Sequence, residues 1–121
     1  MLAGGSAGAQ EAKVKVGLML PYSGTYAQLG KDITDGFKLA INEKGGKLGG
    51  KEIEYFTVDD ESDPAKATDN ANKLVSRDKV DVLIGTVHSG VAMGMIKVAK
   101  ENNTITIIPN AGAAAATGPL C

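Results

Sequence analysis

The residues best suited to do chemistry lie in one short stretch, Thr86-Val87-His88-Ser89-Gly90. It stands between an apolar run over residues 82–84, typical of a strand buried in a parallel sheet, and apolar residues that recur at helical spacing over residues 91–99. Ser89 occupies the position expected of a helix N-cap, where free backbone N–H groups and the positive end of the helix dipole favour an anion. We therefore expect Ser89 and Gly90 to bind the carboxylate of a ligand.

His88 beside Ser89 also suggests nucleophilic catalysis. A catalytic serine needs a base that reaches it across space and an acid that orients that base. Adjacent side chains usually point apart, and His88 is the single histidine of the chain. The sequence therefore favours a protein that is not an enzyme, with His88 shaping the wall of the binding site and direct contact with the ligand as the alternative.

A phosphate-binding loop is suggested by residues 45–51, GGKLGGK. The motif requires Ser or Thr next, where Glu52 stands, and it must follow a strand and open a helix, whereas this stretch follows a helix and precedes a strand. No GxGxxG follows the first predicted strand. We expect a helix end followed by a turn, and no cofactor.

An acidic cluster, Asp59, Asp60, Glu61 and Asp63, is compatible with a calcium loop or with the acidic site of a phospho-receiver domain. Pro64 stands where the calcium loop requires glycine. The receiver needs an aspartate where this chain has Gly85-Thr86. We therefore predict a solvated loop in which Asp63 caps the next helix, and no metal site.

Four strands are expected to position these residues, over 13–20, 53–58, 82–84 and 104–108. Helical periodicity separates them, and the first helix carries its apolar residues on one face: Leu29, Ile33, Phe37, Ala40 and Ile41. The order β-α-β-α-β-α-β predicts an α/β fold with a doubly wound parallel sheet and strand order 2-1-3-4, the second strand at an edge. Ligands bind outside the carboxyl ends of such strands, where the loops 21–30, 86–90 and 110–112 meet.

Length and composition fit one domain. The 121 residues include 13 basic and 14 acidic side chains, a formal net charge of −1, and no basic cluster interleaved with aromatic residues, so a nucleic-acid partner is not expected. No apolar run reaches the roughly 18 residues that a membrane span needs. Residues 1–12 are expected to be a disordered tail, either a signal-peptide remnant ending near Ala7-Gly8-Ala9 or a tag. Cys121, the single cysteine, can form no internal disulfide.

Three blocks of sequence, residues 16–30 (VGLMLPYSGTYAQLG), 35–67 and 80–94 (VDVLIGTVHSGVAMG), resemble one family. It is the leucine/isoleucine/valine-binding protein family among the type I periplasmic substrate-binding proteins of ABC transporters. The resemblance covers residues 14–120. It implies a periplasmic protein of two flavodoxin-like lobes that close on a small carboxylate, either a branched-chain or related amino acid or an aromatic acid, and deliver it to a membrane permease.

The resemblance also assigns roles. It places the ligand carboxylate on Ser89, with help from backbone groups of Asn110 and Gly112. Leu29 stands where members often have an aromatic residue that packs on the ligand, so Tyr22 or Tyr26 would substitute for it. The segment HSGVAMG (residues 88–94) resembles members that bind aromatic carboxylates.

Family members are much longer, so residues 13–121 are expected to be a truncated amino-terminal lobe carrying a half-site. The fourth strand would then lack a neighbour, which predicts a homodimer formed by edge pairing or by domain swapping. The alternative is an autonomous flavodoxin-like module that binds phosphate or flavin.

Overall fold

Five strands form one sheet in the computed structural model, which describes residues 12–117. The strand order is β2-β3-β1-β4-β5, and the bounds are β1 (Val14–Leu20), β2 (Lys47–Leu48), β3 (Lys51–Asp59), β4 (Val82–Ile84) and β5 (Ile105–Ile107). β1 pairs in parallel with both β3 and β4, and β4 pairs in parallel with β5. The four strands predicted from the sequence therefore lie side by side as predicted.

β2 is a strand that the sequence pattern did not predict, because residues 47–50 were interpreted as a turn. It pairs antiparallel with the first two residues of β3. The connection is Gly49-Gly50, whose φ angles of 56° and 80° are both positive. Two left-handed residues are what a tight β-hairpin requires. β3 therefore lies at the edge of the sheet over most of its length, because β2 pairs with its first two residues only.

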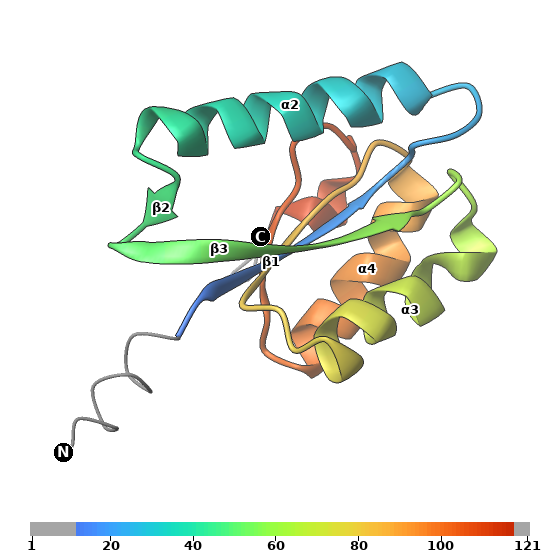
Figure 1. Ribbon diagram of the computed structural model, residues 1–121. Helices are drawn as coiled ribbons and strands as arrows, with labels where there is room; N and C mark the ends of the chain where they lie inside the picture. Colours follow the sequence, from blue (N-terminus) through green and yellow to red (C-terminus); the bar gives the residue numbers. More distant parts are fainter. Residues whose placement is uncertain (1–11, 118–121) are drawn as a thin grey trace, which may run out of the picture.

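Helices cover both faces of the sheet (Figure 1). α2 (Ala27–Glu43) lies on one face, and α3 (Pro64–Asn72) and α4 (Ser89–Glu101) lie together on the other. α3 continues into a π-helical segment, η1 (Lys73–Arg77), and a 3₁₀ turn, η2 (Ala114–Ala116), stands in the stretch interpreted as a loop. The doubly wound α/β fold is confirmed.

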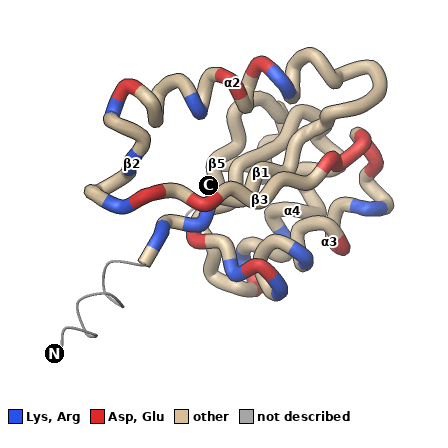
Figure 2. Tube along the Cα trace, in the orientation of Figure 1, with Lys and Arg blue, Asp and Glu red and all other residues tan. Residues whose placement is uncertain are grey.

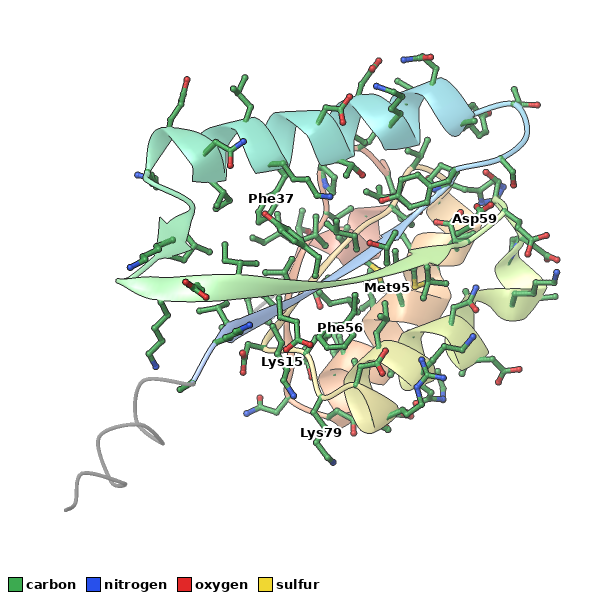
Figure 3. The ribbon with its side chains drawn as sticks, in the orientation of Figure 1. Lys15, Phe37, Phe56, Asp59, Lys79 and Met95 are labelled. Atoms are coloured by element: carbon green, nitrogen blue, oxygen red, sulfur yellow. The ribbon has the colours of Figure 1, made fainter. Side chains whose placement is uncertain are left out.

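β1 supplies the centre of the core because its alternate residues point to opposite faces of the sheet. Val16, Leu18 and Leu20 are fully buried in the cluster beneath α2, and Met19 is fully buried in the cluster against α3 and α4. Figure 3 shows this division, with Phe37 between α2 and the sheet, and Phe56 and Met95 on the other side. Two apolar layers therefore hold the sheet.

α2 ends as predicted but buries a smaller face than predicted. The N–H of Gly46 (φ 79°) bonds to the carbonyl of Ile41 at 2.9 Å, which closes the helix end with left-handed glycines. Ile41 is buried, whereas Leu29 is 41% exposed and Ala40 is also exposed, so the prediction of a buried face is wrong for these two. At Leu29, the helix meets the chain after β1 through the neighbouring Gly30, which is buried against the backbone of Pro21.

β5 is only half covered. Thr106 is buried, but its neighbours Ile105 and Ile107 are 61% and 50% exposed on the other side of the strand. Among residues 12–117, β5 pairs with β4 alone. Within the described residues, β5 therefore leaves both apolar surface and a strand edge uncovered.

Charged side chains of both signs are spread over the helices and loops of the described part, with an acidic segment where β3 ends (Figure 2). Within residues 12–117, none of the helices combines the length and the apolar character needed to cross a bilayer. The predicted tail and Cys121 lie outside the described residues, apart from the last residue of the tail, residue 12, which is exposed.

Gly30→Ala is expected to lower the free energy of unfolding by about 3 kcal/mol or more, because a Cβ there would overlap the Pro21 carbonyl oxygen. Gly36→Ala is the matched control on the same helix, with open space around its Cβ, and should raise stability by about 0.5–1 kcal/mol. Urea denaturation of both variants checks this. Equal effects of the two substitutions would contradict the packing described.

Candidate functional site

The carboxyl ends of β1, β4 and β5 lie at one edge of the sheet because the three strands are parallel. Two hydrogen bonds join the loops after β4 and β5. The Gly85 N–H donates to the Ile107 carbonyl at 3.1 Å, and the Ala111 N–H donates to the Thr86 carbonyl at 3.0 Å. The segment that carries Ser89 is therefore fixed against the segment that carries Asn110 and Gly112.

The cap of α4 is His88, so the prediction that Ser89 is the N-cap is wrong. His88 has an extended backbone (φ −83°, ψ 126°), and its Nδ1 accepts hydrogen bonds from Gly90 N–H at 3.0 Å and Val91 N–H at 3.4 Å. A ring nitrogen that accepts must carry no proton. The imidazole thus occupies the backbone N–H of Gly90, which the sequence analysis assigns to the ligand, and the N–H of Val91.

Ser89 is the first residue of α4 and is exposed. Neither its backbone N–H nor its hydroxyl makes a hydrogen bond to any other residue within 12–117. At a helix start both groups can donate to an anion, and the helix dipole adds to the attraction. Of the two residues predicted to bind a carboxylate at this helix start, Ser89 and Gly90, only Ser89 keeps its donors unengaged within residues 12–117.

Tyr22 follows β1 and is half-buried beneath α2. Its hydroxyl lies 2.6 Å from Thr34 Oγ1, and Thr34 donates its own proton to the Gly30 carbonyl at 2.9 Å. Tyr22 is therefore the donor of this pair. Burial raises the pKa of Tyr22, and nearby aspartates raise it further, against the opposing effect of the Thr34 bond. The hydroxyl is used inside the lobe, which removes it as a donor to a ligand.

Four other predicted site residues are accessible. Tyr26 and Leu29, at the start of α2, are 40% and 41% exposed. Asn110 and Gly112 are exposed on either side of Ala111. The structure thus leaves apolar and aromatic surface on the first loop and polar backbone on the last, with Ser89 on the loop between them in the sheet order.

The acidic loop after β3 is not uniformly solvated, which corrects the prediction. Asp63 does cap α3, accepting from Ala65 N–H at 2.9 Å. Asp60, however, is fully buried and accepts the hydroxyl proton of Thr86, which is also fully buried. Nothing in the sequence distinguishes Asp60 from its less buried acidic neighbours, so reasoning from sequence missed both Asp60 and Thr86.

Asp59, labelled in Figure 3, ties the same loop to the loop after β1. Its Oδ1 accepts from the N–H groups of Tyr22 and Glu61, each at 2.9 Å. Partial burial would raise the pKa of Asp59, but these bonds and those from Ser23 outweigh it and lower the pKa below its usual value. The carboxylate is thus held ionised as an acceptor.

Five of the eight predicted site residues are exposed, and the other three are partly buried. A hollow of about 600 Å³ lies between β3 and the α3–η1 helix, and none of the predicted site residues lines it. Within residues 12–117 the structure holds no group of three or more His, Cys, Asp or Glu side chains placed to hold a metal. What gathers at the strand ends is a helix start, a free hydroxyl and exposed apolar side chains.

These features define a doubly wound α/β lobe whose strand-end loops meet at one edge of the sheet. A family model described as "Periplasmic binding protein" matches residues 13–121, and the chain belongs to this family.

The relatives are consistent with this assignment. The chain is 35% identical over 105 residues to the Leu/Ile/Val-binding protein BraC3 of Rhizobium johnstonii, covering 84% of this chain and 28% of BraC3. A solute-binding protein of an ABC transporter from R. palustris, solved in complex with benzoate, is 60% identical with a TM-score of 0.82, over 84% of this chain and 28% of that one. A second, from Rhodopseudomonas palustris BisB5 in complex with 3,4-dihydroxybenzoic acid, is 32% identical with a TM-score of 0.79 over the same shares. The chain spans little more than a quarter of these relatives.

His88→Ala should lower the free energy of unfolding by about 1 kcal/mol, because two amides at the start of α4 lose their acceptor. His88→Asn retains a side-chain oxygen that can cap, and should recover most of that loss. Thermal denaturation compares the two variants. If alanine and asparagine proved equivalent, the imidazole would not be the cap.

Proposed function

We propose that this chain belongs to a solute-binding protein of an ABC transporter and supplies one side of a site for a small carboxylate. The observation that carries the proposal is Ser89, whose N–H and hydroxyl are unengaged within the described part and lie together at the start of α4. Such a pair matches the two oxygens of a carboxylate, and each charge-assisted hydrogen bond is worth about 1.5–3 kcal/mol. The start of α4 carries the positive end of the helix dipole, which attracts the negative charge of a carboxylate.

An aromatic acid of the benzoate class is the ligand we infer. None of the eight predicted site residues carries a negative charge, and the neighbouring Asp59 and Asp60 are already engaged by hydrogen bonds within the protein. A ligand with an α-ammonium group would find no acidic partner among these eight residues, whereas an apolar ring can lie against Tyr26 and Leu29. The R. palustris relative in complex with benzoate supports the same class.

Binding, and not catalysis, is the role that His88 supports, because its Nδ1 is occupied by the α4 cap and cannot act as a base. Delivery to a membrane permease and a periplasmic location follow from membership of the family and form part of this proposal. The surface described here is open, so we expect weak binding by this chain, in the millimolar range at about 4 kcal/mol.

Ser89→Ala should weaken benzoate binding by roughly tenfold or more, since it removes one charge-assisted hydrogen bond. Ser76→Ala is the control, because Ser76 is also an exposed serine but lies in η1. Titration calorimetry with benzoate measures both. Benzoate affinity that is unchanged in Ser89→Ala contradicts the proposed site.

Parallel titrations separate the alternatives. Leucine binding tighter than benzoate would indicate the branched-chain class named by the Rhizobium relative. Binding of inorganic phosphate or flavin mononucleotide, with no response to either carboxylate, would support the flavodoxin-like module and overturn the transport proposal.

We also propose that this chain forms a homodimer through β5. Ile105 and Ile107 expose apolar surface, and the outer edge of β5 has no strand beside it within residues 12–117. Two copies related by a two-fold axis can pair these edges and cover both isoleucines.

Ile105→Lys combined with Ile107→Lys should shift the dimer to monomer at tens of micromolar, because buried charges at the edge oppose pairing. Leu39→Lys is the control, since Leu39 is a similarly exposed (59%) apolar residue on α2. Sedimentation velocity measures the populations. A wild-type chain that is monomeric at this concentration contradicts the proposed dimer. A monomer is the expected result if another segment covers β5 in a longer protein.

A further inference from the structure

The one buried acidic side chain within residues 12–117 lies outside the residues assigned to the ligand. Asp60 has no exposed surface, and the other buried polar residues of the described part are threonines. Burying a carboxylate is costly unless hydrogen bonds satisfy it. Its partners therefore show what the fold gains by keeping an acid at this position.

Both carboxylate oxygens of Asp60 are engaged. Oδ2 accepts the hydroxyl proton of Thr86, and Oδ1 accepts from the Ser62 N–H at 2.8 Å. The backbone of Asp60 is fixed as well, because its N–H donates to the Leu20 carbonyl at 3.0 Å. Asp60 thus joins the ends of β1, β3 and β4.

Thr86 passes this restraint to the ligand site. Its carbonyl accepts the Ala111 N–H at 3.0 Å, and Ala111 lies between Asn110 and Gly112. Along the chain, Thr86 stands three residues before Ser89. Asp60, at the end of β3, therefore holds the side chain of Thr86, and the carbonyl of Thr86 holds the loop after β5. The chain that follows Thr86 carries Ser89, the residue proposed to bind the anion.

Asp59 makes the matching restraint on the other side, since it accepts from Tyr22 N–H at 2.9 Å in the loop that leads to Tyr26 and Leu29. Two adjacent aspartates at the end of β3, neither of them among the predicted site residues, thus fix the loops after β1 and after β4. Figure 2 shows this acidic segment at the strand-end edge.

We propose that Asp60 is a positioning residue for the carboxylate site, acting through the hydroxyl of Thr86 to hold Ser89 and the loop after β5 in binding geometry. The inference rests on the proposed function. A contribution to stability alone would leave ligand affinity unchanged in the folded protein, whereas positioning predicts a loss of affinity that tracks the hydroxyl of Thr86.

The decisive comparison is Thr86→Val with Thr86→Ser. Valine keeps the shape and removes the donor, so benzoate affinity should fall by about tenfold, whereas serine keeps the hydroxyl and should stay within about twofold of wild type. Asp63→Ala is the control, because it removes the α3 cap without contacting Thr86, and it should lose stability but keep its benzoate affinity. Asp60→Asn, expected to weaken binding by about threefold because a neutral bond replaces a charge-assisted one, serves if the valine variant does not fold.

Amide hydrogen exchange of Ala111 provides a readout that needs no ligand. Thr86→Val should speed its exchange by about tenfold relative to Asp63→Ala, and Thr86→Ser should not. If the wild-type chain fails to bind benzoate but this exchange pattern appears, the proposed function fails and the positioning role stands. The positioning role is overturned if folded Thr86→Val leaves both the benzoate affinity and the Ala111 exchange rate unchanged. If the valine variant does not fold, an unchanged benzoate affinity in Asp60→Asn overturns it.

Discussion

Parallel pairing of β1 with β3 on one side and β4 on the other is the constraint on which the rest of this structure depends. It sends the carboxyl ends of the strands to one edge, so loops distant in sequence become neighbours. Close packing at β1 makes the pairing possible. Gly17 faces Val80 and Leu83, where a Cβ would lie 3.1 Å from the nearest Val80 methyl carbon. The site is therefore a product of the sheet and cannot form on any single loop.

The loops at that edge are held mainly by hydrogen bonds to carboxylates and carbonyls. Asp59 fixes the loop after β1, Asp60 fixes Thr86, and the Thr86 carbonyl fixes Ala111. His88 then satisfies the start of α4 with its own ring nitrogen. The consequence is a surface in which the N–H groups of Tyr22, Gly90 and Ala111 are engaged within the protein, whereas the donors of Ser89 are not engaged within residues 12–117. A rigid frame around a few free donors lowers the cost of ordering the site when the ligand binds.

Much of the fold could be predicted from the sequence because its signals are local. The apolar run at Val82–Ile84, the Asp63-Pro64 helix start and the Gly45-Gly46 helix end each report on neighbouring residues, and each was correct. β2 was missed because two residues between glycines carry no periodicity. The exposure of Leu29 was missed because sequence spacing does not reveal that the helix meets the chain after β1 through the neighbouring Gly30.

The candidate site could be predicted only in outline. Its place at the strand ends and the family follow from the sequence, but the cap of α4 does not, because histidine is a rare N-cap beside a serine that is a common one. The roles of Asp60 and Thr86 depend on a contact across 26 positions of sequence, which no local pattern encodes. Tyr22 or Tyr26 is predicted to pack on the ligand, and that prediction does not reveal that the Tyr22 hydroxyl bonds to Thr34, twelve positions along the chain.

The most direct test of the carboxylate site is a ¹H–¹⁵N correlation spectrum of this chain titrated with benzoate. If Ser89 receives the carboxylate, its amide should shift most, followed by amides of the neighbouring loop at Ala111 and Gly112, with little change near Phe56 and Arg77 in the hollow beside β3. Shifts confined to that hollow, or a Ser89 amide that does not move at saturating benzoate, would contradict the account.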